Sequence, residues 1–456
     1  MIPARFTAGS LPRQLLAMAG ASGAGQLALF LVDILTLTYV AMLHDQTLLA
    51  AVGLAKTLVF VNAAFASGVV IAGGVVLSER IGRHAGQRRG RLVSHLLVLA
   101  LAIAAGVALL ELLCVAPVSR WLGADTQAFA QAQHFIWLAL PASVLQAGMQ
   151  MCAQLLKAQG LVRLALVLLL CGAGSLALAD PLLIFACGLG LDGAALAYAL
   201  SSLLSLLVGL VLVKRHIGLS LPRSARLLAL HMGRTLRVAL PVMLGNLAMP
   251  VGITCLMLTM AAQGAAALAG MTVVDRVLQL AYCVFFALPG ALVPVLAQNI
   301  GAGCDVRAAR AIVISRRLVL LYGVAVWLLL IVCGPAIADH FELVDSGRAV
   351  FLAMCHYGAG FWLLAGLDFV AQATFLTIGR AWWVPTLGWL RGTLGSVPFV
   401  LVGARYGGAP GALVGMWCGN GLVAVAAVWL AARQARAFFA LRRAMFNDRK
   451  EAYVHD

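Results

Sequence analysis

The sequence predicts an all-α polytopic membrane protein with twelve transmembrane helices. Composition is the first reason, because 63% of the 456 residues are hydrophobic and only 11% are charged, against roughly 45–50% and about 25% in a soluble domain. The second reason is that the apolar residues form long runs rich in Leu, Ala, Val and Gly, and a helix needs about 20 such residues to cross a bilayer. A lipid-facing β-barrel would instead alternate apolar and polar residues, and the runs do not alternate.

Polar breaks divide these runs into helices in chain order. Each run ends where charged residues, glycine or proline interrupt it. The first half contains six runs, which span residues 15–41, 49–78, 92–116, 132–156, 161–186 and 191–213. A basic segment broken by Pro222 follows. The second half contains six more, which span residues 236–262, 266–297, 312–336, 349–377, 382–404 and 409–432.

The basic residues set the orientation of these helices. A formal net charge of +16 would suggest a nucleic-acid partner in a soluble domain. Of the 32 Lys and Arg, however, 27 lie in segments on one side of the predicted helices, Arg380 and Arg391 among them, and three lie in loops on the other side. The positive-inside rule places the basic side in the cytoplasm. We therefore expect a multi-pass protein of the cell inner membrane with both termini cytoplasmic, embedded in the lipid bilayer and binding no nucleic acid.

The motifs of enzymes and metal proteins are absent from the sequence. Nearly all of the ten Cys lie inside apolar runs, and no CxxC pair occurs, so they read as small packing residues. No HExxH, GxSxG or Walker lysine motif is present either. We expect no enzymatic activity, no cofactor, no metal centre and no use of ATP by this chain.

The two halves of the chain repeat one another. A gapless shift of 219 residues superimposes the loop after the second run on the loop after the eighth, and it also matches the glycines that follow the fourth and tenth runs. The matched pairs are Gly82 with Gly301, Arg88 with Arg307, Arg91 with Arg310, and Gly160 with Gly379. Because each repeat has an even number of helices, both enter the membrane in the same orientation. We predict an N-terminal six-helix lobe (1–213), a cytoplasmic linker (214–236) and a C-terminal six-helix lobe with a basic tail (237–456).

Four stretches in this order resemble the multidrug and toxic compound extrusion (MATE) family of cation-coupled antiporters. They are Val32-Asp33 with residues 49–54; Asp180-Pro181 with Gly190 and Gly193-Ala194-Ala195; Leu240-Pro241; and Ala297-Gln298-Asn299-Ile300-Gly301. The resemblance covers nearly the whole chain. It implies two six-helix bundles that form a V around a central cavity, and drug export driven by inward flow of H⁺ or Na⁺.

Two carboxylates inside the first half are the leading candidates for the coupling site. Asp33 and Asp180 lie deep in the first and fifth runs at similar predicted depth, where an ionised carboxylate costs at least about 2.5–3.5 kcal/mol. Facing one apolar pocket, they could not both ionise cheaply, so one would hold a proton. The MATE resemblance places its cation site on the same two residues. The alternative is that each makes a structural contact between helices.

The residues around this pair favour a proton over Na⁺. Related members that bind Na⁺ have an Asn four residues before the second Asp and a Thr after the Gly-x-Ala-Ala stretch, where this chain has Leu176 and Tyr198. Because Na⁺ prefers several oxygen ligands and a proton needs one carboxylate, we predict H⁺ coupling and keep Na⁺ as the alternative.

Other polar residues in the runs are candidates for the substrate cavity: Gln26, Asn62, Tyr198, Asn246, Asp368 and Gln372. Asp368 lies near Phe361, Trp362, Phe369 and Phe375, and an acid with aromatic rings suits a lipophilic cation. A hydrogen bond to a neighbouring helix is the structural alternative for each. Asp275 and Arg276 are read as structural, and Glu111 is expected to reach the membrane surface without a role.

The combined prediction is a monomeric secondary active exporter of amphiphilic or cationic small molecules, driven by proton antiport. A flippase of lipid-linked glycans from the same superfamily is the alternative. It would need cations in its cavity to hold a pyrophosphate, and the candidates are Lys56 and Arg276, the two basic residues counted in neither set of loops.

Overall fold

The computed structural model describes the backbone of residues 5–43, 46–83, 89–121, 126–220 and 224–452. These residues are almost entirely helical, and no strand occurs among them. Eleven helical stretches are long and apolar enough to cross a membrane. The last stretch, Trp383–Met445, has 63 residues and contains non-helical backbone at Gly407 and Gly408, so it accommodates two of the predicted runs. The all-α polytopic fold with twelve apolar helices is confirmed.

The chain divides into two compact units. Unit 1 contains Gly20–Met243, and unit 2 contains Phe6–Ala19 together with the chain from Leu244 onward. The units differ from the predicted lobes in two places. The start of the first helix belongs to unit 2, and the predicted linker 214–236 is partly helical, because it includes the end of one helix and the first half of another. The division into lobes at residues 213 and 237 stays a prediction.

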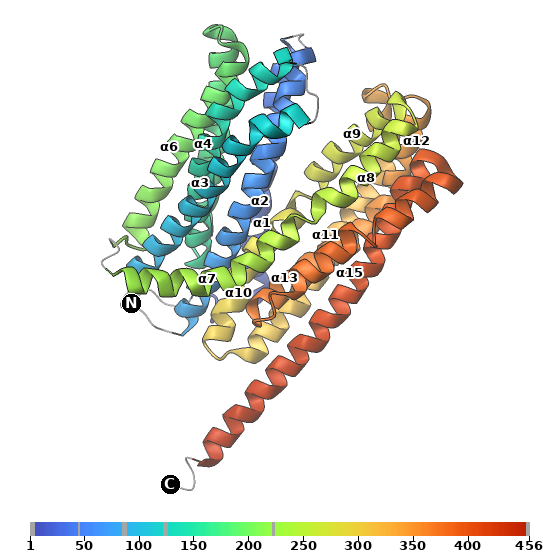
Figure 1. The fold of residues 1–456 in the computed structure, drawn as a ribbon. Helices are drawn as coiled ribbons and strands as arrows, with labels where there is room; N and C mark the ends of the chain where they lie inside the picture. The colour runs from blue at the N-terminus through green and yellow to red at the C-terminus, as the bar shows by residue number, and fades with distance from the viewer. Residues whose placement is uncertain (1–4, 44–45, 84–88, 122–125, 221–223, 453–456) are drawn as a thin grey trace. The chain divides into compact units, whose positions relative to one another are not determined.

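Unit 1 is built around one central helix (Figure 1). Its helices are α1 (Leu11–Ala41, from Gly20 onward), α2 (Gln46–Gly82), α3 (Arg89–Trp121), α4 (Thr126–Ala158), α5 (Val162–Pro181), α6 (Gly190–His216) and α7 (Ala225–Asn246, up to Met243). Helix α4 packs against α2, α3, α5 and α6. Small residues allow the close approach, since a Cβ on Gly73 would touch Met151 and one on Gly209 would touch Cys152.

Unit 2 has a comparable arrangement (Figure 1). Its helices are α8 (Met249–Ala262), α9 (Ala265–Ala281), α10 (Cys283–Gly301), α11 (Asp305–His340), α12 (Asp345–Ala353), α13 (Ala359–Thr377), α14 (Trp383–Gly392) and α15 (Val397–Ala452). Helix α13 packs against α10, α11 and α15. The C-terminal part of α15, which carries the basic tail, extends beyond the neighbouring helices of this unit.

Five predicted runs are interrupted in the structure. Two of them are broken by short non-helical segments, 236–262 between Asn246 and Met249, and 382–404 between Gly392 and Val397. The predicted continuous helix 266–297 is wrong in detail, because α9 ends at Ala281 and α10 begins at Cys283. Tyr282 between them is fully buried, and its hydroxyl donates to the carbonyl of Ala359 at 2.9 Å. Wider π-helical turns follow α5 at Leu182–Ala186 and α12 at Met354–Gly358. Such turns often occur near functional sites, and the first directly follows Asp180-Pro181.

A glycine stripe joins the two arms of α15. The chain reverses at Gly408, where φ is +58° and ψ is −146°, a backbone conformation open almost only to glycine. After the reversal, three glycines at four-residue spacing face backbone carbonyl oxygens of the segment that precedes the reversal. A Cβ on Gly411 would collide with Gly403, one on Gly415 with Phe399, and one on Gly419 with Gly395. The helices therefore pack backbone to backbone, as small residues permit in membranes.

We expect Gly419→Ala to destabilise unit 2. The added methyl group has no room against the Gly395 carbonyl, and overpacking of this kind costs about 1–3 kcal/mol. Thermal melting of purified protein in detergent should show a lower transition temperature. Gly174→Ala on α5 is the matched control, because a Cβ there has nothing within 4 Å. Equal melting of the two variants would contradict the close contact.

Candidate functional site

The polar core of unit 1 brings four helices together. The predicted carboxylates Asp33 and Asp180 lie on α1 and α5, while Lys56 on α2 and Tyr198 on α6 are their neighbours. Lys56 Nζ donates to Asp33 Oδ1 at 2.6 Å. The charge of Lys56 also acts on Asp180, and that of Asp33 acts on Tyr198. The structure therefore brings both predicted carboxylates close to one basic residue, Lys56.

Asp180 is the more enclosed of the two carboxylates. It is fully buried, in the last turn of α5. Oδ2 accepts a hydrogen bond from the hydroxyl of Thr36, one turn after Asp33 on α1. Oδ1 is buried and receives no hydrogen bond from the described residues. A buried carboxylate with an unsatisfied oxygen and no cation bonded to it is costly when ionised, so this site is suited to hold a proton.

Asp33 lies in a more exposed position. Its side chain is 46% exposed and that of Lys56 is 31% exposed, and the two form an ion pair. The paired Lys56 changes the predicted picture of two carboxylates facing one apolar pocket, because Asp33 is already neutralised where it lies. Of these two carboxylates, Asp180 is therefore the one that can change protonation without breaking an ion pair.

The remaining candidates in unit 1 have different surroundings. Asn62 on α2 is fully buried, and its side-chain amide donates to the carbonyl of Ala104 on α3 at 2.9 Å. This contact matches the alternative to a substrate-cavity role, a hydrogen bond to a neighbouring helix. Gln26 is partly buried on α1. Glu111 was expected to reach the membrane surface, and this is wrong. It is 8% exposed and faces Asn62, because it projects between α3 and α2.

Unit 2 contains a second membrane-embedded ion pair. Asp368 on α13 accepts hydrogen bonds at Oδ2 from Arg391 on α14, at 2.6 Å, and from Gln372 one turn away, at 2.8 Å. The side chain of Asp368 is 7% exposed and that of Arg391 is 27% exposed. The structure thus joins the predicted Asp368 and Gln372, and adds Arg391, which had been counted among the cytoplasmic basic residues. Asn246 ends α7 in the same unit.

Aromatic rings around α10 and α13 contact one another in the same unit, although not all the predicted ones belong to this cluster. Trp362 stacks on Tyr282 with ring centroids 5.5 Å apart. Phe286 contacts both Trp362 and Phe369, at 5.5 and 6.1 Å. Phe375 faces Trp383 instead. The Nε1 donor of Trp362 is buried and has no hydrogen-bond partner among the described residues.

Two of the acids inside the spans form ion pairs with bases among the described residues. Lys56 offsets Asp33, and Arg391 offsets Asp368. Within α9, Gln279 donates to Asp275 at 2.7 Å, which agrees with the structural interpretation of that residue. Two buried carboxyl groups, Asp180 and Glu111, form no ion pair with a described residue.

Comparisons with known proteins agree on one family. The MatE family model matches residues 21–180 and 241–382. A relative, the uncharacterized 21 kDa protein in the iaaL 5′ region of Pseudomonas savastanoi, is 37% identical over 53% of this chain and 80% of its own. The FAD transporter of Shewanella oneidensis is 27% identical to this chain. The matched region covers 56% of this chain and 58% of that protein.

Solved structures show the same fold at lower identity. The Vibrio cholerae MATE transporter VcmN in its bent form has a TM-score of 0.87 and 22% identity, with 95% of this chain and 98% of that one covered. A transporter of the MOP superfamily from Pyrococcus furiosus has a TM-score of 0.87 and 20% identity, with 96% and 99% covered. These likenesses establish the fold.

Proposed function

The chain belongs to the MatE family of membrane transporters, and from that premise we propose that it is a proton-driven exporter of amphiphilic or cationic small molecules. The observation that carries the proposal is Asp180, which is fully buried, has one unsatisfied oxygen and adjoins a neutralised Lys56–Asp33 pair. We also propose that the protein is a monomer of the cell inner membrane with both termini and the segment 214–236 in the cytoplasm.

Proton binding at Asp180 supplies the coupling in this scheme. Protonation removes the cost of enclosing a negative charge away from water, and it favours the packing in which α5 and α1 exclude solvent around Thr36. Release of the proton to the cytoplasm reverses that preference. If substrate binds better to the other packing, proton and substrate affinities are linked, and the linkage is reciprocal in binding free energy.

The substrate candidates are polar and aromatic side chains, each considered within its own unit. The predicted contacts Gln26, Tyr198 and Asn246 are retained as candidates. Asp368 attracts a cation only if the substrate competes with Arg391, because the two side chains already form an ion pair. The rings of Trp362, Phe286 and Phe369 contact one another in the same unit, and such rings suit flat lipophilic cations.

We expect export to follow a pH gradient and to ignore Na⁺ at fixed pH. Purified protein in liposomes would be given either gradient alone, and uptake of a lipophilic cation such as ethidium would be followed by fluorescence. The proton needs only the carboxyl of Asp180, whereas the places of two Na⁺ oxygen ligands hold Leu176 and Tyr198. A requirement for Na⁺ would overturn the proton scheme in favour of sodium antiport.

A flavin nucleotide is the second candidate substrate. The FAD transporter of Shewanella oneidensis is a relative, although an anionic substrate would have to compete with Asp33 for Lys56 and with Asp368 for Arg391. Competition between FAD and ethidium in the same liposomes separates the two substrate classes. The structure weakens the alternative of a lipid-linked glycan flippase, because Lys56, one of its two candidate pyrophosphate ligands, is already bonded to Asp33.

A further inference from the structure

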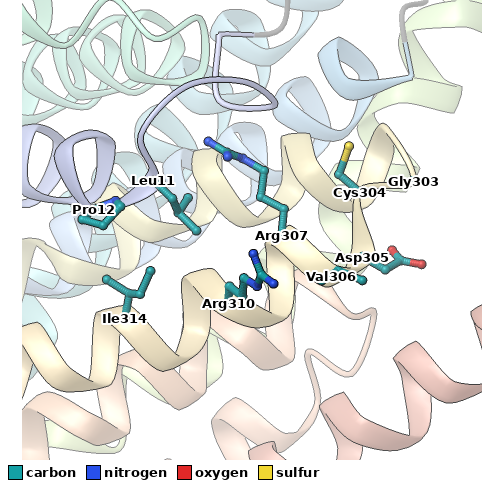
Figure 2. Close-up of a pocket in the computed structure, with 9 residues that line it drawn as sticks. All are labelled: Leu11, Pro12, Gly303, Cys304, Asp305, Val306, Arg307, Arg310 and Ile314. Atoms are coloured by element: carbon teal, nitrogen blue, oxygen red, sulfur yellow. The ribbon is translucent and has the colours of Figure 1, made fainter.

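A pocket in unit 2 lies outside the coupling and substrate residues. It has a volume of about 470 Å³ and lies where the start of α1 meets the start of α11 (Figure 2). Its lining consists of Leu11, Pro12, Gly303, Cys304, Asp305, Val306, Arg307, Arg310 and Ile314. In Figure 2 the two arginines lie between Leu11, Pro12 and Ile314 on one side and Cys304 on the other. The pocket therefore combines a cationic centre with apolar walls.

The wall formed by the N-terminal segment is held in place by hydrogen bonds. The backbone N–H of Phe6 donates to Gln298 Oε1 at 3.2 Å, and its carbonyl accepts from Asn299 Nδ2 at 3.1 Å. Arg307 donates to the carbonyls of Phe6 and Ala8 at 3.0 and 3.2 Å and to Gln14 Oε1 at 2.9 Å. The Gln-Asn pair that closes α10 thus fixes the residues leading into α1. The hydrogen bonds of Arg307 hold the same segment in place, although its positive charge still faces the pocket.

Arg310 is the group available to a ligand. It is exposed, and no described residue forms a hydrogen bond or ion pair with its guanidinium group. The acid that lines the pocket, Asp305, forms an ion pair with Arg442 at 3.1 Å, and its carboxylate points away from the two arginines in Figure 2. The pocket is therefore positively charged, and the five N–H donors of the Arg310 guanidinium group are available to a ligand.

A ligand that fits must be anionic at one end and apolar at the other. The pocket occupies the loop end of apolar helices, on the side of the membrane that we assign to the cytoplasm, and Val306 is 57% exposed at its edge. Basic pockets at the cytoplasmic ends of transmembrane helices are suited to anionic lipid headgroups. A guanidinium group binds phosphate oxygens in bidentate geometry. We propose that this pocket binds the headgroup of an anionic phospholipid, with Arg310 on the phosphate and the acyl chains along Leu11, Val306 and Ile314.

The thiol of Cys304, which lines the pocket and is partly exposed, provides a local reporter. Purified full-length protein would be placed in nanodiscs of phosphatidylcholine with or without phosphatidylglycerol. The rate at which N-ethylmaleimide alkylates Cys304 would then be measured by peptide mass spectrometry. Bound phosphatidylglycerol should shield the thiol, and native mass spectrometry should detect a retained lipid.

Two variants separate binding in the pocket from a general effect of membrane charge. Arg310→Gln should weaken lipid retention roughly five-fold, the effect of about 1 kcal/mol per basic residue, and should restore rapid alkylation. Arg443→Gln, an exposed arginine on α15 that does not line the pocket, changes the net charge equally and should behave like the unaltered protein.

The outcomes are decisive whether or not the transport proposal is correct, since the assay measures neither transport nor sidedness. Equal behaviour of the two variants would overturn the lipid site. Protection of Cys304 by inorganic phosphate in pure phosphatidylcholine discs would show a phosphate site without lipid selectivity, and would also overturn it. Melting curves of both variants verify that the exposed substitutions leave the fold intact.

Discussion

Asp180→Asn abolishes proton-driven export in our scheme while the protein remains folded and inserted. The amide keeps the size of the side chain and can still accept the hydrogen bond from Thr36, but it cannot cycle between charged and neutral forms. Uptake of ethidium into liposomes under a pH gradient should fall to the level of empty liposomes. Substrate affinity in detergent should also lose its dependence on pH between about 5 and 8, because the linked proton site is gone.

Matched variants make this test specific. Asp345→Asn is the control, since Asp345 is exposed and has a positive φ of 46°, a conformation that Asn tolerates well. Asp33→Asn should also stop export, because it leaves Lys56 free to pair with Asp180 and hold it ionised. Accumulation of substrate against a gradient by the Asp180→Asn protein would show that the carboxyl group is structural.

Arg391→Gln is expected to destabilise the protein by about 3 kcal/mol, the lower end of the cost of removing one partner from a buried ion pair. Asp368, with a side chain only 7% exposed, would be left with Gln372 alone. The melting temperature in detergent should fall clearly. The double variant Asp368→Asn/Arg391→Gln should recover most of the loss, because neither buried charge remains.

The double variant also separates structure from substrate binding. Arg405→Gln, which changes an exposed arginine on α15, serves as the control for net charge. If Asp368 attracts cationic substrates, the folded double variant should bind ethidium more weakly. Melting of Arg391→Gln at the temperature of the unaltered protein would mean that the pair contributes nothing to stability.

Sequence patterns predicted the helices well because lipid imposes a simple rule on composition. A run of about 20 apolar residues must be a helix, whatever packs around it. The same rule cannot locate breaks inside a run. At the interruption, the Tyr282 hydroxyl donates to the carbonyl of Ala359, 77 residues later in the chain, and the surrounding residues are as apolar as those of an unbroken helix.

The candidate site was predicted only in part because partners on different helices leave little trace in one sequence. Carboxylates inside apolar runs were visible, and Asp33, Asp180 and Asp368 were found in that way. Lys56 was visible too, but nothing in its own run showed that it bonds to Asp33. Arg391 was counted as a cytoplasmic residue, although it lies within the predicted run 382–404. A useful signal was present: each base follows its acid by 23 residues, about one span and a turn.

That spacing has a consequence for biogenesis. Each ion pair joins helices consecutive in the chain, α1 with α2 and α13 with α14, so each acid leaves the ribosome shortly before its base. A single charged residue near the centre of a span opposes partition from the translocon into lipid by about 2.5–3.5 kcal/mol. A hairpin of two spans whose charges have already met carries no net charge. We infer that each of these spans enters the bilayer together with its neighbour, and that separating Asp368 from Arg391 would leave the later helix stranded at the translocon before any transport could occur.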